Sequence, residues 1–363
     1  MLTIDIIKAK QLKDKPDPNN LGFGNYFTDH MFVMDYQEGM GWHNPRVKPY
    51  EDLHLDPSAV VFHYGQEMFE GLKAYRRQDG EINLFRPDMN GKRLNNTNDR
   101  ICMPQIPVED FVQAVRTLVH TDASWVPEEA GTSLYIRPFV IATEPTLMVN
   151  PSKSYLFMII LSPVGAYYKE GLNPVRIYVE DTYVRASKGG VGEAKTGGSY
   201  GASMIAQKNA KNEGFAQVLW LDAIEHRYVE EVGTMNIFFK ICGKVYTPAL
   251  SGSILPGITR DSVISLLKSW DIPVFEERIS MDTIIEASKN GDLEEVFGTG
   301  TAAVISPVGG IHFKGLDFVV HGNEIGPITR RIYDTLTGMQ YGDVKDDFGW
   351  IETIEDKHEH GWL

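Results

Sequence analysis

Cysteine is scarce in this sequence. Cys102 and Cys242 are the two that occur, and they do not form a CxxC pair. A disulfide framework needs several cysteines, and a cysteine-based zinc site needs closely spaced ones. The sequence therefore predicts neither, and we expect no metal site.

Long hydrophobic runs are also lacking. The best run, residues 154–164, is shorter than the roughly 18 residues that a membrane helix requires, and it has the length of a strand. The first residues show neither the apolar segment of a signal peptide nor the Arg- and Ser-rich pattern of a transit peptide. We therefore expect a cytoplasmic protein without a membrane partner.

Positive charge is in deficit, with 35 lysines and arginines against 49 aspartates and glutamates, and the net charge is −14. The long-range field of such a protein repels polyanions, so we expect no nucleic-acid partner, although a local basic pocket could still bind one small anion. The rest of the composition is ordinary. Hydrophobic residues at 42% and charged residues at 23% exclude a disordered or fibrous chain. A length of 363 residues predicts two or three domains, of which we expect two.

Strand and helix patterns in the first half follow no regular alternation. Residues 72–77 and 81–86 flank Gln78-Asp79-Gly80, which is a hairpin turn signal, and a helical apolar stripe begins after Pro107. Further runs typical of strands are residues 133–141 and 155–161. Because strands do not alternate with helices, the sequence predicts an α+β fold rather than a doubly wound sheet.

A segment rich in turn-forming residues, 164–173, separates two apolar runs and is the predicted interdomain linker. We therefore expect an N-terminal domain over residues 1–163 and a C-terminal domain over residues 174–363. In the second domain, strands are expected at residues 175–179, 216–221, 236–241 and 244–247. Helices are expected there at residues 258–270, 281–289 and 325–339.

A glycine-dense stretch, residues 187–201, predicts a backbone that turns sharply or approaches a ligand closely. One interpretation is a nucleotide-binding P-loop, because Gly189 and Lys195-Thr196 have the register of that motif. Against this, Ala194 stands where a P-loop needs glycine, and Gly197-Gly198 disfavour the helix that should follow the lysine. A flexible surface loop with a solvated lysine is the other alternative.

A pair of carboxylates, Glu230-Glu231, enters a strand whose later residues are apolar. For a lone glutamate at a strand start, solvation is the simplest explanation. A lysine and a carboxylate together, however, are what pyridoxal phosphate (PLP) chemistry needs. The lysine amine forms a Schiff base with the cofactor aldehyde, and the carboxylate keeps the pyridinium nitrogen protonated. Lys195 and Glu231 are the candidates for these two roles.

A PLP phosphate would also need a binding site, and two segments offer one. Residues 255–260 begin a helix, whose unpaired N–H groups favour an anion. Residues 297–302 form a Gly/Thr run that predicts a nest of backbone donors with a hydroxyl. Each segment alone is typical of an ordinary cap or turn. Together with Lys195 and Glu231, they favour a PLP site.

These segments resemble the class IV PLP-dependent aminotransferases, and specifically the branched-chain amino acid aminotransferases. The resemblance follows the order of the family from about residue 23 to residue 342, nearly the whole chain. The matching segments are residues 27–31, 64–75, 84–87, 135–138, 189–201, 231–238, 255–260 and 297–302. The resemblance implies fold-type IV, with a small mixed α/β N-terminal domain and a larger C-terminal domain whose barrel-like sheet is surrounded by helices.

The resemblance also implies roles for the cofactor-binding residues. Lys195 would be the Schiff-base lysine, which also moves the proton between the substrate and the cofactor. Glu231 would pair with the pyridinium nitrogen, and Tyr200 would bond the phenolic oxygen of the cofactor. The groups implied for the phosphate are Arg93, Arg185, the backbone N–H groups of Ile258 and Thr259, and the Thr301 hydroxyl.

For the substrate, strand alternation puts Tyr135 and Arg137 on one face. An aromatic wall beside a guanidinium suits a pocket that accepts both an aliphatic side chain and the γ-carboxylate of glutamate. An arginine extending from a sheet edge is the alternative. By resemblance, the pocket is completed by Phe23, Tyr64, Phe69, Tyr167, Thr234 and Ala302. Tyr64 and Tyr135 are expected near a dimer interface.

The activity implied by the resemblance is transfer of the amino group of leucine, isoleucine or valine to 2-oxoglutarate, which gives branched-chain 2-oxo acids and glutamate. The expected assembly is a homodimer. D-amino acid aminotransferase and 4-amino-4-deoxychorismate lyase are alternatives on the same scaffold, and Gln66-Glu67 with the Tyr135-Ile136-Arg137 pattern favours the branched-chain enzyme. A binding protein without PLP is disfavoured, because Lys195 and Glu231 are both present.

Overall fold

Two units make up the chain. Unit 1 consists of residues Met1–Tyr167 and Gly338–Leu363, and unit 2 of residues Tyr168–Thr337. The computed structural model describes residues 1–165 and 172–354. Each unit has its own sheet and its own hydrophobic core.

The division between the units falls within the predicted linker, residues 164–173, of which residues 166–171 lie outside the described part of the chain. The predicted domain assignment is wrong for the end of the chain, because residues from Gly338 onward belong to unit 1. The physical reason is strand pairing: β18 (Ile351–Ile354) forms an antiparallel ladder with β6 (Ile82–Phe85). Unit 1 is therefore completed by the last described strand.

Unit 1 is built on a sheet of nine strands among its described residues, in the order β1-β3-β2-β8-β7-β5-β6-β18, with β4 paired to β7. Neighbouring strands are antiparallel except β1 and β3. Besides β6 and β18, the strands are β1 (Asp5–Ile6), β2 (His30–Gln37), β3 (Gly41–Pro49), β4 (Glu67–Phe69), β5 (Leu72–Arg76), β7 (Ser133–Ala142) and β8 (Ser154–Val164). The predicted hairpin is confirmed, since β5 and β6 are antiparallel and Gly80 in their turn has a φ of +91°.

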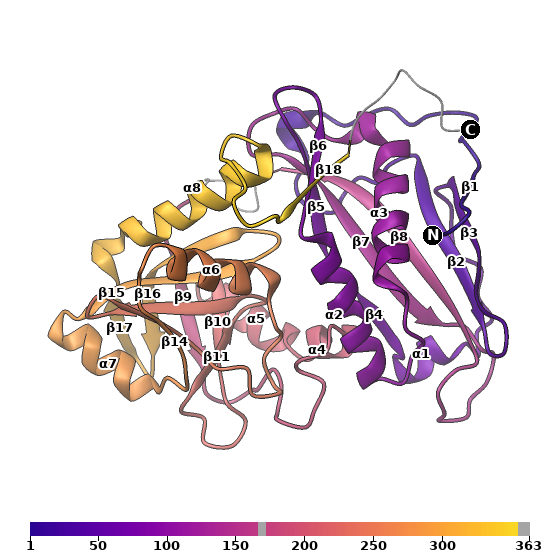
Figure 1. The fold of residues 1–363 in the computed structure, drawn as a ribbon. Coiled ribbons are helices and arrows are strands. Elements are labelled where there is room, and N and C mark those ends of the chain that lie inside the picture. The colour runs from indigo at the N-terminus through magenta and orange to yellow at the C-terminus, as the bar shows by residue number, and fades with distance from the viewer. Residues whose placement is uncertain (166–171, 355–363) are drawn as a thin grey trace. The chain divides into compact units, whose positions relative to one another are not determined.

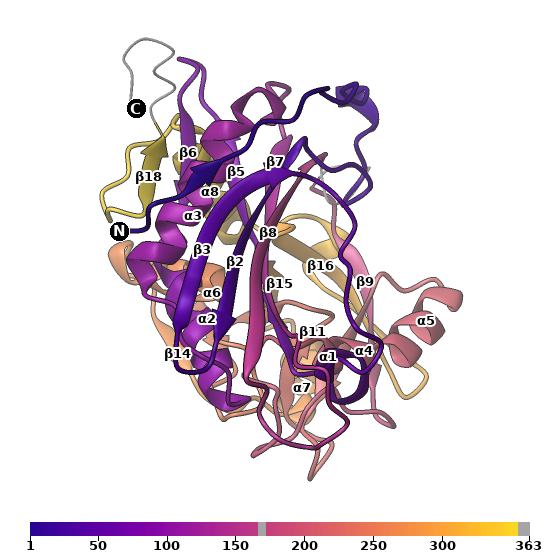
Figure 2. The ribbon, with the colours of Figure 1, turned by 90° about the vertical axis from the view of Figure 1, so that its right-hand side faces the viewer.

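Two helices of unit 1, α2 (Pro87–Arg100) and α3 (Val108–Thr121), pack on one face of this sheet (Figure 1). The predicted stripe of α3 is buried there against the side chains of β7 that point to the same face, such as Leu134 and Ile136. A third, short helix is α1 (Val60–Tyr64). In Figure 2, strands β2, β3 and β8 lie in front of α3, so the face turned to the viewer is the one opposite these helices.

Unit 2 is also built on a sheet of nine strands among its described residues, in the order β11-β10-β9-β16-β15-β12-β13-β14, with β17 paired to β16. Strand β9 is parallel to both of its neighbours, and β13 is parallel to β14. The strands are β9 (Val175–Glu180), β10 (Gln217–Leu221), β11 (Val229–Val232), β12 (Asn236–Ile241), β13 (Lys244–Thr247), β14 (Val274–Glu276), β15 (Leu293–Gly300), β16 (Val304–Phe313) and β17 (Leu316–Val319). The predicted strands of this half are confirmed within one residue at each end.

The helices that belong to unit 2 include all those predicted for the second half of the sequence. They are α4 (Gly197–Gly201), α5 (Met204–Asn212), α6 (Ile258–Ser269), α7 (Met281–Asn290) and α8 (Pro327–Tyr341), the last of which continues into unit 1. Helix α8 begins where the buried Glu295 carboxylate accepts the N–H groups of Ile328 and Thr329. The predicted α+β class is confirmed, because strands and helices do not alternate along either unit.

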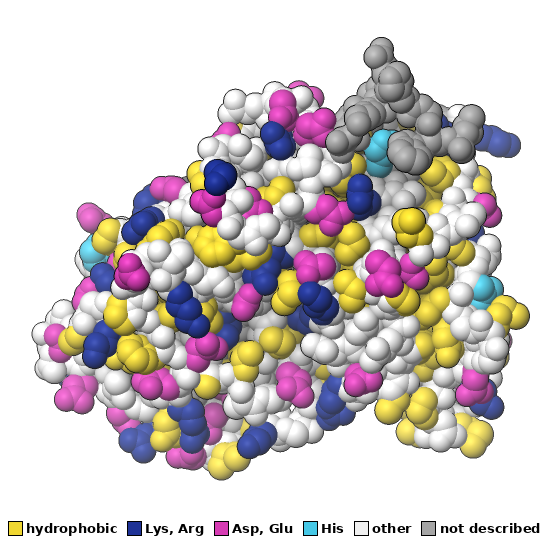
Figure 3. Space-filling view, viewed as in Figure 1, with side chains coloured by type: hydrophobic (Ala, Val, Ile, Leu, Met, Phe, Trp, Pro, Cys, Tyr) yellow, Lys and Arg dark blue, Asp and Glu magenta, His cyan; other side chains and the backbone are white. Residues whose placement is uncertain are grey.

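The surface shown in Figure 3 carries acidic and basic side chains interspersed with apolar ones. Among the described residues, the helices are too short or too polar to cross a bilayer. Cys102 and Cys242 are both exposed and unbonded to each other.

Candidate active site

Glu231 lies in the middle of β11, a strand in which every side chain is buried. The side chain is 3% exposed, and burial is the main reason that the pKa of its carboxyl is raised from 4.5 to about 7. Arg185 and Lys195 act in the opposite direction, because nearby positive charge favours the carboxylate. Glu231 is thus a buried acid that is poised to titrate near neutrality.

Two side chains hold the Glu231 carboxylate. The Arg185 guanidinium forms an ion pair with Oε2, and its Nη2 also donates to the carbonyl oxygens of Gly192 and Ser253, at 3.0 and 3.1 Å. The amide of Asn236 donates to Oε1 at 3.3 Å. Arg185 is therefore found beside the carboxylate, and its predicted contact with a phosphate stays a prediction.

Lys195 lies at the end of the glycine-dense loop, and its Nζ donates to the Tyr200 hydroxyl at 2.7 Å. The loop requires glycine at position 192, because a Cβ there would lie 2.2 Å from the Ser253 carbonyl oxygen. The prediction that Gly197-Gly198 prevent a helix is wrong, because α4 begins directly at Gly197. Glycine is tolerated there because α4 is a single short turn, which has few intrahelical bonds to lose.

A small pocket brings these groups together within unit 2. It is lined by Arg185, Ser199, Tyr200, Ser203, Glu231, Gly233 and Thr234. The turn that carries Thr234 is fixed, because the N–H of Met235 donates to Val232 and the N–H of Val232 donates to Met235, both at 2.9 Å. Gly233 in this turn has a φ of +57°, and a Cβ there would lie 2.0 Å from the Gln217 Oε1, so glycine is required.

The first turn of α6 supplies the predicted backbone donors, Ile258 and Thr259. The helix follows Gly257, which carries no side chain to cap it, so the first N–H groups are available for an anion. Ile258 and Thr259 are both buried, at 8% exposure. The predicted start of this helix is confirmed.

The predicted nest at residues 297–302 is mostly wrong. Phe297, Gly298 and Thr299 belong to β15 and pair with both β12 and β16, and Gly300 at the end of β15 pairs with β16, so their backbone groups serve the sheet. Thr301 and Ala302 do lie in the turn between β15 and β16, and both are partly exposed. The Thr301 hydroxyl remains a candidate for an anion, without the nest around it.

Several features of unit 2 fit a group with a basic ring nitrogen and an anionic tail. The Glu231 Oε2, which contacts Arg185, accepts no well-aligned hydrogen bond within the described part of the chain, so it has room for a further donor. A ring N–H⁺ is such a donor, and it would also compensate the burial of this carboxylate. The uncapped first turn of α6 suits the anionic tail, and the Lys195 amine suits an aldehyde. The residues present therefore fit PLP.

In unit 1, four predicted substrate residues form one cluster. The Arg137 guanidinium lies over the ring of Phe69 at 4.6 Å and its Nη2 donates to the Tyr135 hydroxyl at 3.0 Å. Phe23 packs edge-on against Tyr135 with the ring centroids 4.9 Å apart. The Arg137 Nε is buried without a hydrogen-bond partner among the described residues. The predicted common face of Tyr135 and Arg137 is therefore confirmed, with donor capacity left on the arginine.

Arg93 and Tyr64 have partners of their own in unit 1. Arg93 donates from Nε and Nη2 to the two oxygens of Glu70, each at 2.8 Å, and both side chains are buried. The Tyr64 hydroxyl donates to the carbonyl oxygen of Leu147 at 2.5 Å, and its ring is 42% exposed. Tyr167 lies outside the described residues, so its predicted place in the pocket stays a prediction.

Two residues that bond to predicted site residues were not predicted from the sequence. Asn236 donates to Glu231, and Glu70 accepts from Arg93. Glu70 could have been suspected, because a glutamate inside an apolar segment requires a partner. No local signal marks Asn236, since its role depends on contacts with residues far along the chain.

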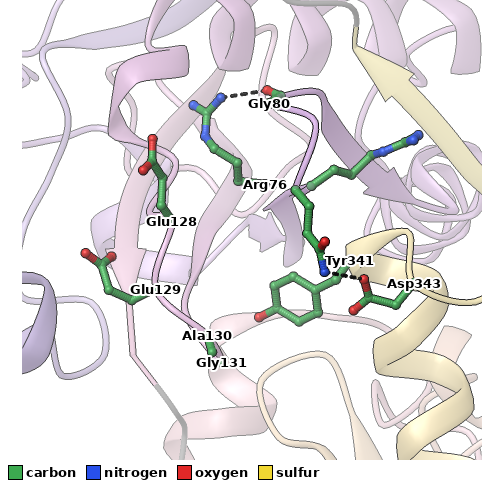
Figure 4. A pocket seen from close by; sticks show the side chains of 10 residues that line it. Arg76, Gly80, Glu128, Glu129, Ala130, Gly131, Tyr341 and Asp343 are labelled. Carbon is green, nitrogen blue, oxygen red and sulfur yellow. Dashed lines mark hydrogen bonds between the residues drawn. The ribbon is translucent and has the colours of Figure 1, made fainter.

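A separate cavity of about 570 Å³ lies in unit 1, and its described lining includes none of the predicted site residues. Its lining includes Arg76, Glu128, Glu129 and Tyr341 (Figure 4). The Arg76 Nη1 donates to the carbonyl oxygen of Gly80 at 2.8 Å, and Gln78 donates to Asp343 at 3.1 Å. Much of its polar lining is therefore already bonded within the protein.

Comparison with known proteins identifies the family. The model of the amino-transferase class IV family matches residues 67–311. The chain is 60% identical to branched-chain-amino-acid transaminase 1 of Bacillus subtilis over 96% of this chain and 98% of that protein. It is 50% identical to the branched-chain-amino-acid aminotransferase of Mycolicibacterium smegmatis over 92% of each chain.

Solved structures agree with these relatives. The branched-chain amino acid aminotransferase of Escherichia coli superposes with a TM-score of 0.72 at 26% identity, over 90% of this chain and 99% of that one. The branched-chain aminotransferase of Thermoproteus uzoniensis, solved with norvaline, gives a TM-score of 0.73 at 26% identity, over 89% of this chain and 100% of that one. The fold and the sequence identity both lead to the same family. The chain belongs to the class IV aminotransferases, among the branched-chain-amino-acid aminotransferases of that family.

Proposed function

We propose that this chain is a PLP-dependent branched-chain amino acid aminotransferase, which transfers the amino group of leucine, isoleucine or valine to 2-oxoglutarate and yields branched-chain 2-oxo acids and glutamate. The observation that carries the proposal is one pocket lined by Tyr200 and the buried Glu231, with the Lys195 amine bonded to the Tyr200 hydroxyl. The names of its relatives, at 50–60% identity over nearly the whole chain, support the substrate class.

When bound, PLP supplies an aldehyde that reacts with amines and a ring that withdraws electrons from the substrate α-carbon. Lys195 provides the amine for that aldehyde, and its Nζ takes and returns the α-proton. The Tyr200 hydroxyl, 2.7 Å from Nζ, orients the amine, and it would bond the phenolic oxygen of bound PLP. Glu231, held by Arg185 and Asn236, keeps a proton on the ring nitrogen.

The phosphate is proposed to bind at the N-terminus of α6, through the N–H groups of Ile258 and Thr259, with the Thr301 hydroxyl. Arg93 and Arg185 are the proposed basic residues for this anion. Arg93 is kept rigid by its two bonds to the buried Glu70. Arg185 serves mainly by its contact with Glu231.

Substrate selection is assigned to the Tyr135–Arg137 cluster. Phe23 and Phe69 give an apolar wall for leucine, isoleucine or valine, whereas the spare donors of Arg137 bind the second carboxylate of glutamate or 2-oxoglutarate. The remaining residues proposed to line the pocket are Tyr64, Tyr167, Thr234 and Ala302.

The assembly is proposed to be a homodimer in the cytoplasm. Leu147, Met148 and Val149 are consecutive apolar residues that are 63 to 77% exposed, and Tyr64 is bonded to the first of them. A contiguous exposed apolar segment is typical of a surface that is covered by a partner. A second copy of the chain is the simplest partner.

The absorbance spectrum of the purified protein tests the proposal. A chromophore that changes on addition of L-leucine and reverts with 2-oxoglutarate is the expected result. A response to D-amino acids alone would instead indicate a D-amino acid aminotransferase, and release of pyruvate from 4-amino-4-deoxychorismate would indicate the lyase. A protein that binds no PLP would contradict the proposed function.

A further inference from the structure

Asn236, the first residue of β12, bonds to two separate parts of the site. Its Nδ2 donates to the Glu231 Oε1 at 3.3 Å and to the carbonyl oxygen of Leu255 at 2.9 Å. Leu255 in turn belongs to the segment that leads into α6, and its backbone lowers the pKa of the Glu231 carboxyl. One amide group therefore joins the carboxylate to the approach of α6.

The other side of this amide contacts the start of α6. A Cβ built on Gly257 would lie 1.9 Å from the Asn236 Oδ1, so the two groups are packed as closely as glycine permits. The Asn236 side chain is 5% exposed, and its backbone is fixed by pairing with Thr299 of β15. The amide therefore has little freedom to move, and neither does the helix start beside it.

We propose that Asn236 is a positioning residue, which sets the separation between the Glu231 carboxylate and the first turn of α6 so that a cofactor is held at its ring nitrogen and at its phosphate at the same time. This inference rests on the proposed function, because it assigns those two ends to PLP. Asn236 bonds to the Glu231 carboxylate and to the segment before α6. It therefore acts on a cofactor through these two groups and not by direct contact.

The charge of Glu231 should depend on this amide. Burial is the largest effect on the pKa of its carboxyl and raises it, Glu230 also raises it, and Arg185 and Lys195 lower it, with a net value of about 7. A hydrogen bond from Asn236 favours the ionised form, so its loss should raise the pKa again. An enzyme without the amide should then need a higher pH to keep Glu231 ionised.

The test compares Asn236→Ala with the wild type in three measurements. We expect PLP to dissociate about tenfold more readily from the variant, as judged by titration of the apoprotein. We also expect the acid limb of kcat/KM, and the pH at which the absorbance of the bound cofactor changes, to move upward by about one unit. Purely structural damage would lower the melting temperature and leave both pH values in place.

One further variant separates packing from hydrogen bonding, and a second variant is a matched control. Asn236→Asp keeps the volume but replaces the donor by an oxygen beside Glu231, so it should be at least as harmful as alanine. If Asn236→Asp had the PLP binding and the two pH values of the wild type, the proposal would be overturned. Asn83→Ala is the matched control, because Asn83 is a buried asparagine of unit 1 with its own partners, Gln340 and Thr353. It should lose stability without a shift in either pH value.

A double-mutant cycle with Gly257 tests the close contact directly. The φ of Gly257 is −69°, so alanine suits the backbone and disturbs mainly the Asn236 amide. Gly257→Ala should weaken PLP binding in the wild type and have much less effect in Asn236→Ala. Equal effects in both backgrounds would overturn the inference. A wild type that binds no PLP would overturn the proposed function instead, so the two failures are distinguishable.

Discussion

Replacing Glu231 by glutamine removes a buried charge while keeping the shape of the side chain. Glutamine can still accept the hydrogen bond of Asn236, but a neutral amide cannot hold a protonated ring nitrogen. The loss falls on the transition state, because only there does the ring carry the electron pair of the α-carbon. Removal of a positioned electrostatic partner of this kind costs roughly 3 kcal/mol, or about a hundredfold in kcat.

In the apoprotein, the same substitution should reduce the loss of stability that the wild type shows as the pH rises. Burial raises the pKa of Glu231 from 4.5 to about 7, so the native state keeps a proton that the unfolded chain releases. The contribution of this carboxyl to stability is therefore complete below pH 4.5 and is lost as the pH rises to about 7. Between pH 5 and pH 8, the linkage relation gives a loss of about 2–3 kcal/mol in the free energy of unfolding.

The assay is urea unfolding of the apoprotein at pH 5 and pH 8, followed by tryptophan fluorescence. Trp220 is a suitable reporter, because it is fully buried in β10 and donates to the carbonyl oxygen of Gly233, next to the site. We expect Glu231→Gln to lose less stability than the wild type over this interval, by about 2–3 kcal/mol.

Glu230 offers the matched control for activity. It is buried on the same strand and accepts a hydrogen bond from Ser253, but it points to the opposite side from its neighbour. Glu230→Gln should retain most of kcat. If Glu230→Gln were crippling and Glu231→Gln silent, or if the pH dependence of stability were the same in Glu231→Gln and the wild type, the role assigned to Glu231 would be wrong.

Two other variants test the lysine and the arginine of the site. Lys195→Ala should abolish transamination while the protein still folds and binds PLP non-covalently. Borohydride reduction of the wild type followed by peptide mapping should label Lys195. A label on Lys188, which is exposed in the same loop, would contradict the assignment. Arg137→Met should lower kcat/KM for glutamate by about 2–4 kcal/mol, because a desolvated, charge-assisted contact is lost, and should leave leucine nearly unaffected. Half-reaction rates measured separately for the two substrates check this, and equal losses would show that Arg137 is structural or binds the shared α-carboxylate.

The parts of the site that could be predicted are those that depend on local sequence. Strand alternation alone puts Tyr135 beside Arg137, and the two are bonded. The start of α6 follows from Pro256-Gly257 and the apolar stripe behind them. Glu231 was singled out by residue type, and its burial then gave it the environment that the chemistry requires.

The parts that could not be predicted depend on pairing between distant segments. Residues 297–300 look like a loop because glycine and threonine alternate, but residues 297–299 are paired on both sides and belong to a central strand. The contact of Asn236 with Gly257 joins residues that no local pattern connects. Gly197 begins a helix because α4 is a short turn, in which the low helix propensity of glycine costs little free energy.

The return of the chain to unit 1 affects how the protein is synthesised. Strand β18 covers the edge of β6, and it is synthesised more than 260 residues after that edge. Until then the hydrogen-bonding groups of β6 have no neighbour on that side, and an open edge is a site for pairing with other chains. A fragment that ends before Gly338 would keep this open edge permanently. Unit 1 is therefore a product of the finished chain rather than of its first half, and the native sheet is sealed only after unit 2 has been translated.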